Sequence, residues 1–225
     1  MGKRQESRDR IEAQIIDLAR SQLATEGAAG LSLRAIARDL GMVSSAVYRY
    51  VASRDELLTL LLIDGYSSLA DEVERARDGS WHEQVRAMSH AARQWAVERP
   101  AQWALLYGSP VPGYHAPRER TVVPGTRVVA ALLDAVAAGI AVGDIPSSET
   151  AAPQPLSGDF ERLREEFDFH GDDAAVTKSL LLWAGLIGAI SLEVFGQYGP
   201  DTLTEPALLF DRQLGLLLDV LTTKY

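Results

Sequence analysis

The sequence predicts an all-α protein of about nine helices. Apolar residues recur at spacings of three and four along most of the chain, which is the helical period. No stretch shows sustained alternation of apolar and polar residues with β-branched enrichment, so strands are not expected. Glycine and proline gather in the breaks between the periodic segments. At 225 residues, 47% of them hydrophobic and 24% charged, the chain can bury a core and has a globular composition.

The first two helices are bounded by clear start and stop residues. An apolar stripe from Ile11 to Leu23 predicts a first helix that ends near Gly27. A second helix is expected over Leu33 to Leu40, with Ser32 as its N-cap and Gly41 ending it. The tight glycine turn that follows is the connection a helix-turn-helix unit requires.

A short third helix is expected to present a polar side to solvent. Val43, Val47 and Val51 are four residues apart and are predicted to form its buried edge. This register places four polar side chains outward: Ser44, Ser45, Tyr48 and Arg49. Small hydroxyl residues near a helix N-terminus allow close approach to base edges, and tyrosine can donate a hydrogen bond to phosphate. The pattern is typical of a recognition helix.

The remaining elements continue the helical pattern. Helices are expected from Ser53, as N-cap, to about Arg77, from Trp81 to Glu98, from Pro100 through a short apolar segment, from about Val122 to Val142, from Asp172 to about Gln197, and from about Glu205 to Thr222. Residues 143–159 hold three prolines and four hydroxyl residues and are interpreted as a flexible surface connection. The acidic cluster over 159–168 is interpreted as a solvated face.

Charge is distributed unevenly along the chain. The net charge is −9, yet residues 1–54 hold nine basic and six acidic residues, which is +3. The rest holds 13 basic and 25 acidic residues, which is −12. A basic end on an acidic body is expected if only that end meets phosphate, although chance clustering gives the same count.

Residues 31–58 resemble the DNA-binding signature of the TetR (tetracycline-repressor) family. The shared features are an Ile-Ala pair, the glycine turn, a tyrosine in the third helix, and a Ser-Arg-Asp-Glu-Leu-Leu start to the fourth. The resemblance implies DNA contacts at Arg34, Ser44, Ser45, Tyr48, Tyr50 and Arg54, beside Arg49 on the same outer side. It also implies a DNA-binding domain over 1–55 and a ligand-binding and dimerisation domain over 56–225.

The chain departs from the family pattern at Val43, Ala46 and Tyr50, so an operator sequence does not carry over from relatives. Other roles for the predicted contact residues remain open. The ring of Tyr48 could pack in the small core, Arg34, like Arg49, could be a solvated charge, and Arg54 could serve only its own helix.

The C-terminal region resembles the family's ligand-binding and dimerisation domain, chiefly over residues 106–114 and 182–193. This resemblance implies a pocket, for which the bulky candidates are Trp95, Trp103, Tyr107, Tyr114, Trp183 and Phe195. It also implies pairing of the last two helices across a two-fold axis, with candidates Ala184, Gly185, Gly188, Ala189, Leu214 and Leu218. Both sets could instead build the protomer core.

Several classes of function are disfavoured by the residues. The absence of cysteine excludes disulfides and thiolate metal sites. Four scattered histidines form no metal-binding pair: His82, His90, His115 and His170. Ser109 lacks the nucleophile-elbow pattern. The longest apolar run, Leu180 to Ile190, is too short to span a bilayer. An enzyme, a cofactor and a membrane partner are therefore not expected.

The sequence thus predicts a cytoplasmic DNA-binding regulator. The resemblance favours repression, with a homodimer that binds a palindromic double-stranded operator and is released by a small, largely apolar effector. An activator of the same family, a small helical enzyme and a helical scaffold that does not bind DNA are the alternatives. The effector, the operator sequence and the target genes stay open.

Overall fold

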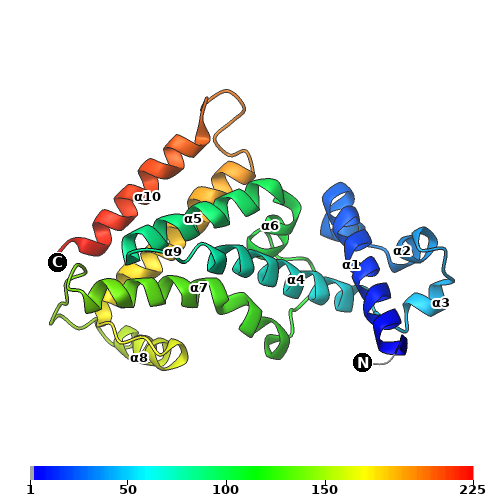
Figure 1. The fold of residues 1–225 in the computed structure, drawn as a ribbon, viewed down its shortest axis with the longest axis horizontal. Coiled ribbons are helices and arrows are strands. Elements are labelled where there is room, and N and C mark those ends of the chain that lie inside the picture. Colours follow the sequence, from blue (N-terminus) through cyan, green and yellow to red (C-terminus); the bar gives the residue numbers. More distant parts are fainter. Residues whose placement is uncertain (1–2, 225) are drawn as a thin grey trace. The chain divides into compact units, whose positions relative to one another are not determined.

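The structure is a computed structural model that describes residues 3–224. Over this range it contains ten helices and no strand, which confirms the all-α prediction (Figure 1). In chain order they are α1 (Lys3–Gly30), α2 (Leu33–Asp39), α3 (Ser44–Val47), α4 (Arg54–Arg75), α5 (Trp81–Glu98), α6 (Pro100–Tyr107), α7 (Arg118–Ala141), α8 (Leu156–Phe167), α9 (Asp173–Val194) and α10 (Pro206–Thr222).

The capping residues act where the sequence places them. The Ser32 hydroxyl accepts a hydrogen bond from the Ala35 N–H, and the Ser53 hydroxyl accepts one from the Glu56 N–H at 3.1 Å. Such bonds satisfy backbone donors that have no partner within the helix. Gly41 follows α2 with a φ of +64°, a conformation that glycine adopts without strain. The starts of α2 and α4 are therefore determined locally.

The interpretation of residues 143–159 as a flexible connection is wrong at its C-terminal end, where α8 begins at Leu156. The periodic signal is present: Leu156, Phe160, Leu163 and Phe167 are four, three and four residues apart. The prolines and serines before and among these positions outweighed it in the prediction. Phe160 is buried, while the acidic residues of α8 lie mostly on its exposed side, as predicted.

The chain forms two compact units. The first comprises Met1–Ser68 and Arg99–Gly125. Its core joins α1, α2, α3 and the start of α4 through twelve buried apolar residues: Ile15, Ala19, Leu23, Leu31, Leu33, Ile36, Ala37, Val47, Val51, Leu57, Leu58 and Leu61. The second unit comprises Leu69–Glu98 and Thr126–Tyr225. The first unit thus extends beyond residue 55 along the chain.

In the second unit, α9 packs against α10 and α5. The buried Lys178 ammonium of α9 donates hydrogen bonds to the Leu221 and Thr223 carbonyls, where the end of α10 leaves carbonyls without a helical partner.

Two helices, α7 and α9, are long and apolar enough to meet the criteria for a membrane span. In their most apolar 18-residue segments, however, 33% and 44% of the residues are buried inside the protein. Core helices of globular proteins meet the same criteria.

A buried ion pair joins α5 to α9. Arg93 donates from Nε to Glu193 at 2.8 Å and from Nη2 to the second carboxylate oxygen at 2.5 Å. Each side chain is only 14% exposed, and the guanidinium also lies 5.7 Å from the Phe210 ring centroid. A bidentate pair out of water is costly to break from one side, because the remaining charge stays buried.

We expect Arg93→Met to lower the free energy of unfolding by about 3 kcal/mol, because Glu193 is left without its partner. The double change Arg93→Met with Glu193→Leu removes both charges and is expected to stay within about 1 kcal/mol of the wild type. Urea unfolding followed by circular dichroism measures both. Arg75→Met, which breaks the exposed pair with Glu72, is the control and should not shift the transition. Equal losses in the single and double variants would contradict this account.

Candidate nucleic-acid interface

The turn between α2 and α3 is closed by backbone hydrogen bonds. The Gly41 N–H donates to the Arg38 carbonyl at 3.0 Å, and the Met42 N–H donates to the Ala37 carbonyl at 2.9 Å. Val43 follows in an extended conformation and serves as the N-cap residue of α3. Only residues 40–43 thus separate α2 from α3, which is the arrangement of a helix-turn-helix unit (Figure 1).

The inner and outer sides of the third helix are sharply different. Val47 and Val51 are buried in the core of the first unit, as predicted. Ser45 and Arg49 are exposed, Tyr48 is 44% exposed, and Ser44 is partly buried. Among the described residues, no side-chain hydrogen bond or ion pair engages the outer group of Ser45, Tyr48 and Arg49. Their polar atoms are therefore available to a partner.

Val43 differs from the prediction, because its side chain is 71% exposed instead of buried. The spacing of four residues assumed helical geometry from Val43 onward. Val43 instead precedes the first helical turn with extended backbone angles, so its side chain does not follow the direction of Val47. An exposed valine thus lies next to Ser44 and Ser45. The sequence could have indicated this exposure, because Val43 occupies the N-cap position of α3, which lies outside the helical register.

Tyr50 and Arg8 bring the start of α1 to the end of the third helix. The Arg8 guanidinium carbon lies 5.7 Å from the centroid of the Tyr50 ring, within the range of a cation–π contact. Arg8 also pairs with Glu12 at 2.7 Å. Tyr50 is partly buried against the core, so its ring has a structural role beside any contact of its hydroxyl. The side chains of Lys3 and Arg4, which add to the predicted basic charge, lie outside the described residues.

The two arginines predicted on α2 and α4 are placed differently. Arg34 is exposed on the first turn of α2, and Arg38, which is not among the predicted contact residues, is exposed one turn later. Their spacing of four places them on one side of the helix. Arg54 donates instead to the Ala28 carbonyl at 2.7 Å and is partly buried. It connects the start of α4 to the end of α1.

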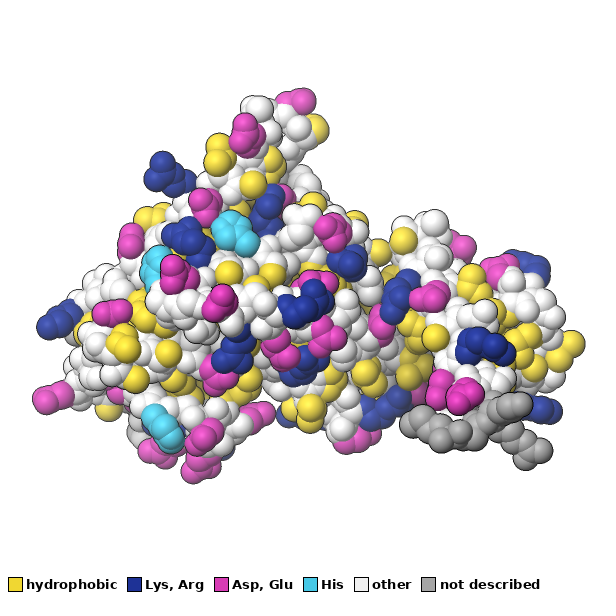
Figure 2. All heavy atoms as spheres, in the orientation of Figure 1, with side chains coloured by type: hydrophobic (Ala, Val, Ile, Leu, Met, Phe, Trp, Pro, Cys, Tyr) yellow, Lys and Arg dark blue, Asp and Glu magenta, His cyan; other side chains and the backbone are white. Residues whose placement is uncertain are grey.

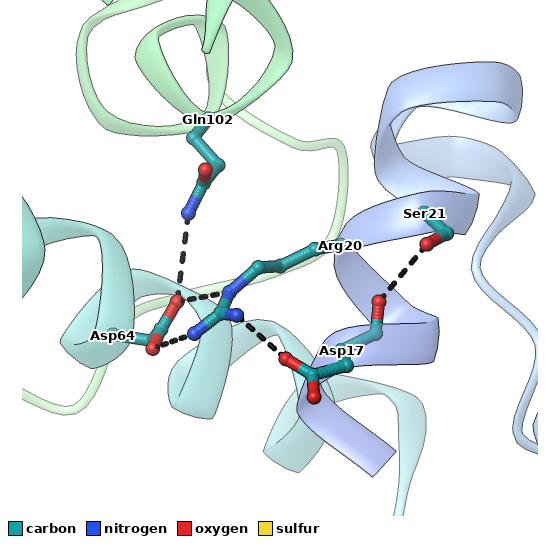
Figure 3. Close-up of polar contacts among 5 residues, drawn as sticks. All are labelled: Asp17, Arg20, Ser21, Asp64 and Gln102. Carbon is teal, nitrogen blue, oxygen red and sulfur yellow. Dashed lines mark hydrogen bonds and ion pairs between the residues drawn. The ribbon is translucent and has the colours of Figure 1, made fainter. Parts of the chain in front are cut away.

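A polar network joins α1, α4 and α6 (Figure 3). Arg20 donates two hydrogen bonds to the Asp64 carboxylate, at 2.8 and 2.6 Å, and one to Asp17 at 2.7 Å. Gln102 donates to the same Asp64 carboxylate at 3.5 Å. The hydrogen bond with Asp64 raises the pKa of Arg20 above its ordinary value. Asp64 therefore links α4 to α1 through a charge-assisted, bidentate contact and to α6 through a single hydrogen bond.

Two further contacts hold the N-terminal half of α4. Arg120 of α7 binds Glu56 with two hydrogen bonds, at 2.7 and 2.9 Å. The Thr59 and Tyr114 hydroxyls lie 2.8 Å apart. Burial raises the pKa of Tyr114, so its hydroxyl stays protonated at neutral pH. The predicted pocket residue Tyr114 thus contacts α4 directly.

The aromatic candidates for a pocket divide between the two units and differ in burial. Trp103 is fully buried, and its ring centroid is 4.4 Å from that of Tyr107 in the first unit. Trp95 is buried in the core of the second unit. Trp183 lines a cavity between α7, α8 and α9, whereas Phe195 is exposed at the end of α9. The aromatic character of a residue therefore does not indicate whether it packs in the core or lines a cavity.

The interface candidates divide between surface and core. Ala184 and Gly188 are exposed on α9. Ala189, Leu214 and Leu218 are buried inside the protomer, so the structure leaves them no surface for a second copy. A Cβ on Gly185 would lie 2.7 Å from the Leu217 side chain, so this glycine permits close packing within the protomer. Apolar residues lie on two sides of α10, and their spacing in the sequence does not indicate which side packs against the rest of the protomer.

The distribution of charged side chains and the arrangement of possible metal ligands narrow the interpretation of the surface. Figure 2 shows basic and acidic side chains interspersed over the face in view, so charge alone does not mark a DNA-binding side there. Within residues 3–224, His, Asp and Glu form no group of three that could hold a metal ion.

Comparison with known proteins matches both parts of the chain. Residues 15–61 match the family described as bacterial regulatory proteins, tetR family, and residues 85–217 match the tetracyclin repressor-like C-terminal domain. The HTH-type transcriptional regulators Rv1816 of Mycobacterium tuberculosis and Mb1846 of Mycobacterium bovis are each 65% identical to it, over 98% of this chain and 96% of theirs.

Solved structures agree with these matches. The regulatory protein SCO4313 superposes with a TM-score of 0.79 and 34% identity, covering 97% of this chain and 100% of that one. The transcriptional regulator FadR of Bacillus subtilis, in complex with stearoyl-CoA, has a TM-score of 0.65 over 92% of this chain and 98% of its own. At 14% identity FadR shows the shared fold alone. The chain therefore belongs to the tetR family of bacterial transcriptional regulators with a helix-turn-helix DNA-binding region, and it is not an enzyme.

Proposed function

We propose that the protein is a cytoplasmic repressor that binds a palindromic operator as a homodimer. A small, largely apolar ligand binds its C-terminal helices and releases the operator. Residues 1–55 contact DNA in this proposal, and residues 56–225 bind the ligand and the second copy. The observation that carries it is the exposed polar side of the third helix, held outward by buried Val47 and Val51.

The base-reading positions follow from exposure. Ser44 and Ser45 begin α3, the end that a recognition helix directs toward base edges. The exposed Val43 beside them supplies an apolar surface suited to the methyl group of thymine. We therefore add Val43 to the predicted contact set.

Phosphate contacts are assigned to the exposed and partly exposed donors around this helix. Tyr48, Arg49 and Tyr50 follow the serines, and Arg34 lies with Arg38 on one side of α2. Phosphate contacts fix the register of a protein on the duplex but do not read sequence. Because Arg54 donates to the Ala28 carbonyl, we assign it first to holding α1 against α4.

A homodimer is supported by an uncovered stripe on α9. Leu181, Ala184, Gly188 and Leu192 are exposed at spacings of three, four and four, so they share one side of the helix. On α10, the helix packed against α9, Leu208 and Leu216 are also exposed. Two helices from each copy would then form a four-helix bundle, in which small residues allow close approach.

In vitro selection from a random DNA pool tests the proposed function. The expected result is a two-fold symmetric site whose half-sites lie about one helical turn, or a multiple of it, apart. Affinity for that site should fall steeply with salt because bound counterions are released. Recovery of no preferred sequence, at low and at moderate ionic strength, would refute it.

Tyr48→Phe is expected to weaken operator binding about tenfold, because the variant loses a hydroxyl that donates to phosphate but keeps the ring. The loss should be similar for all tight-binding sequences, since a phosphate contact is independent of base identity. Fluorescence anisotropy with labelled duplexes measures it. Tyr198→Phe, at a partly buried tyrosine after α9, is the control and should bind as the wild type does. Wild-type affinity of Tyr48→Phe would remove Tyr48 from the interface.

Ala184→Asp is expected to convert the dimer to monomers and to reduce operator affinity at least a hundredfold, because a charge would be buried between the two copies. Sedimentation velocity and operator binding measure the two effects. Ala138→Asp places the same charge on an exposed position of α7 and should stay dimeric with full affinity. A dimeric Ala184→Asp protein would show that the exposed stripe is not the interface.

Asp64→Asn is expected to weaken operator binding several-fold, because Arg20 loses its ionic partner and α1 is held less firmly. Simple electrostatics predicts the opposite sign, since removing an acid makes the protein less negative. The slope of affinity against salt should stay unchanged, whereas losing a phosphate contact reduces it by about one. Asp71→Asn, which also removes an acid from α4, is the control. Tighter binding by Asp64→Asn would overturn this positioning role.

A further inference from the structure

An apolar cavity lies between α7, α8 and α9 of the second unit. Its volume is about 40 Å³, and its walls are the apolar side chains of three helices, among them Leu133, Leu163, Val176 and Trp183. Ser179, which also lines it, donates its hydroxyl proton to the Ala175 carbonyl at 2.7 Å. A cavity of such composition favours apolar occupants over water.

Arg164 of α8 is the one charged residue among the cavity's lining. The same side chain also lines an open polar cleft with Ser157, His170 and Asp173. Arg164 thus belongs to the walls of both an apolar cavity and an open polar cleft. This position suits a molecule that has a hydrocarbon part and one polar end.

The hydrogen bonds of Arg164 and Asp173 indicate that the polar end of such a molecule carries a negative charge. Asp173 accepts from Arg164, from the Ala152 N–H and from the Ser157 hydroxyl, each at 2.8 Å, and its side chain is 9% exposed. These donors hold the pKa of Asp173 below its ordinary value. Arg164 is 23% exposed and gives Asp173 one of its five N–H groups. Arg164 is therefore the group with capacity for a new partner.

Nearby charges and hydrogen bonds are consistent with an exchange of partners at Arg164. If Arg164 turns to a new anion, Asp173 retains the Ala152 and Ser157 donors. Asp172 is occupied by the Ser148 and Ala175 N–H groups, and Glu149 at the rim of the cleft is exposed. An arginine binds a carboxylate in bidentate fashion, which one bond to Asp173 does not use fully.

We propose that this cavity binds an apolar carboxylic acid, with its hydrocarbon chain between α7, α8 and α9 and its carboxylate on Arg164. The proposal rests on the proposed function, of which this acid is the effector. Since 40 Å³ holds only a few carbon atoms, a longer hydrocarbon chain would require α8 to move outward. Phe160, Leu163 and Phe167 of α8 would then pack on the ligand.

Dodecanoate is the probe, added below its micellar concentration to the full-length protein without DNA, and isothermal titration calorimetry measures its binding. Saturable binding with one site per chain is expected. Arg164→Gln should weaken it about tenfold or more, because the ionic partner of the carboxylate is lost. Arg162→Gln, on the same helix but exposed and paired with Asp159, should bind as the wild type does. Dodecylamine should bind more weakly than dodecanoate.

Val129→Phe, which fills the cavity from α7, is the second variant and should abolish binding while Arg164 remains. Absence of saturable binding, unchanged affinity in Arg164→Gln, or tighter binding of dodecylamine would overturn the proposal. The measurement is separable from the proposed function because no operator is present. Binding at Arg164 without release of the selected operator would keep the site and remove its role as an effector site.

Discussion

Burial of Val47 and Val51 is the constraint on which the DNA-binding surface depends. A helix of four residues is not stable alone, so its position comes from tertiary packing. Both valines lie in the core shared by α1, α2 and α4, and burying each contributes roughly 1.5–3 kcal/mol. Once they point inward, Ser45 and Tyr48 must point outward. The same two contacts therefore stabilise the unit and orient its polar side.

Polar contacts on α4 form a second layer around that core. Asp64 ties α4 to Arg20 of α1, and Glu56 ties it to Arg120 of α7. These pairs are bidentate, so they specify direction as well as proximity. Apolar contacts tolerate small shifts, whereas a bidentate pair has one good geometry. The direction of α4 is thus fixed by one bidentate pair to α1 and by another to α7.

Much of the fold could be predicted because its signals are local. Helix starts at Ser32 and Ser53 need only a side chain and a backbone N–H three residues later, and both predictions are confirmed. The helix from Leu156 was missed because nearby prolines and serines masked its apolar spacing. Arg54 was predicted to face DNA, yet it donates to Ala28, a residue 26 positions away that sequence spacing cannot bring near it.

The sequence alone determined the all-α class and the helix-turn-helix, because periodicity, caps and turn residues act over a few positions. The family came from the resemblance of residues 31–58 to a known signature. Tertiary structure decided which apolar faces are covered. Leu214 is enclosed by its own protomer while Leu216, two residues on, is exposed, although the two look alike in sequence. It also placed Arg164 in the wall of a cavity. Burial and ion pairing depend on distant segments meeting, and no local pattern records that.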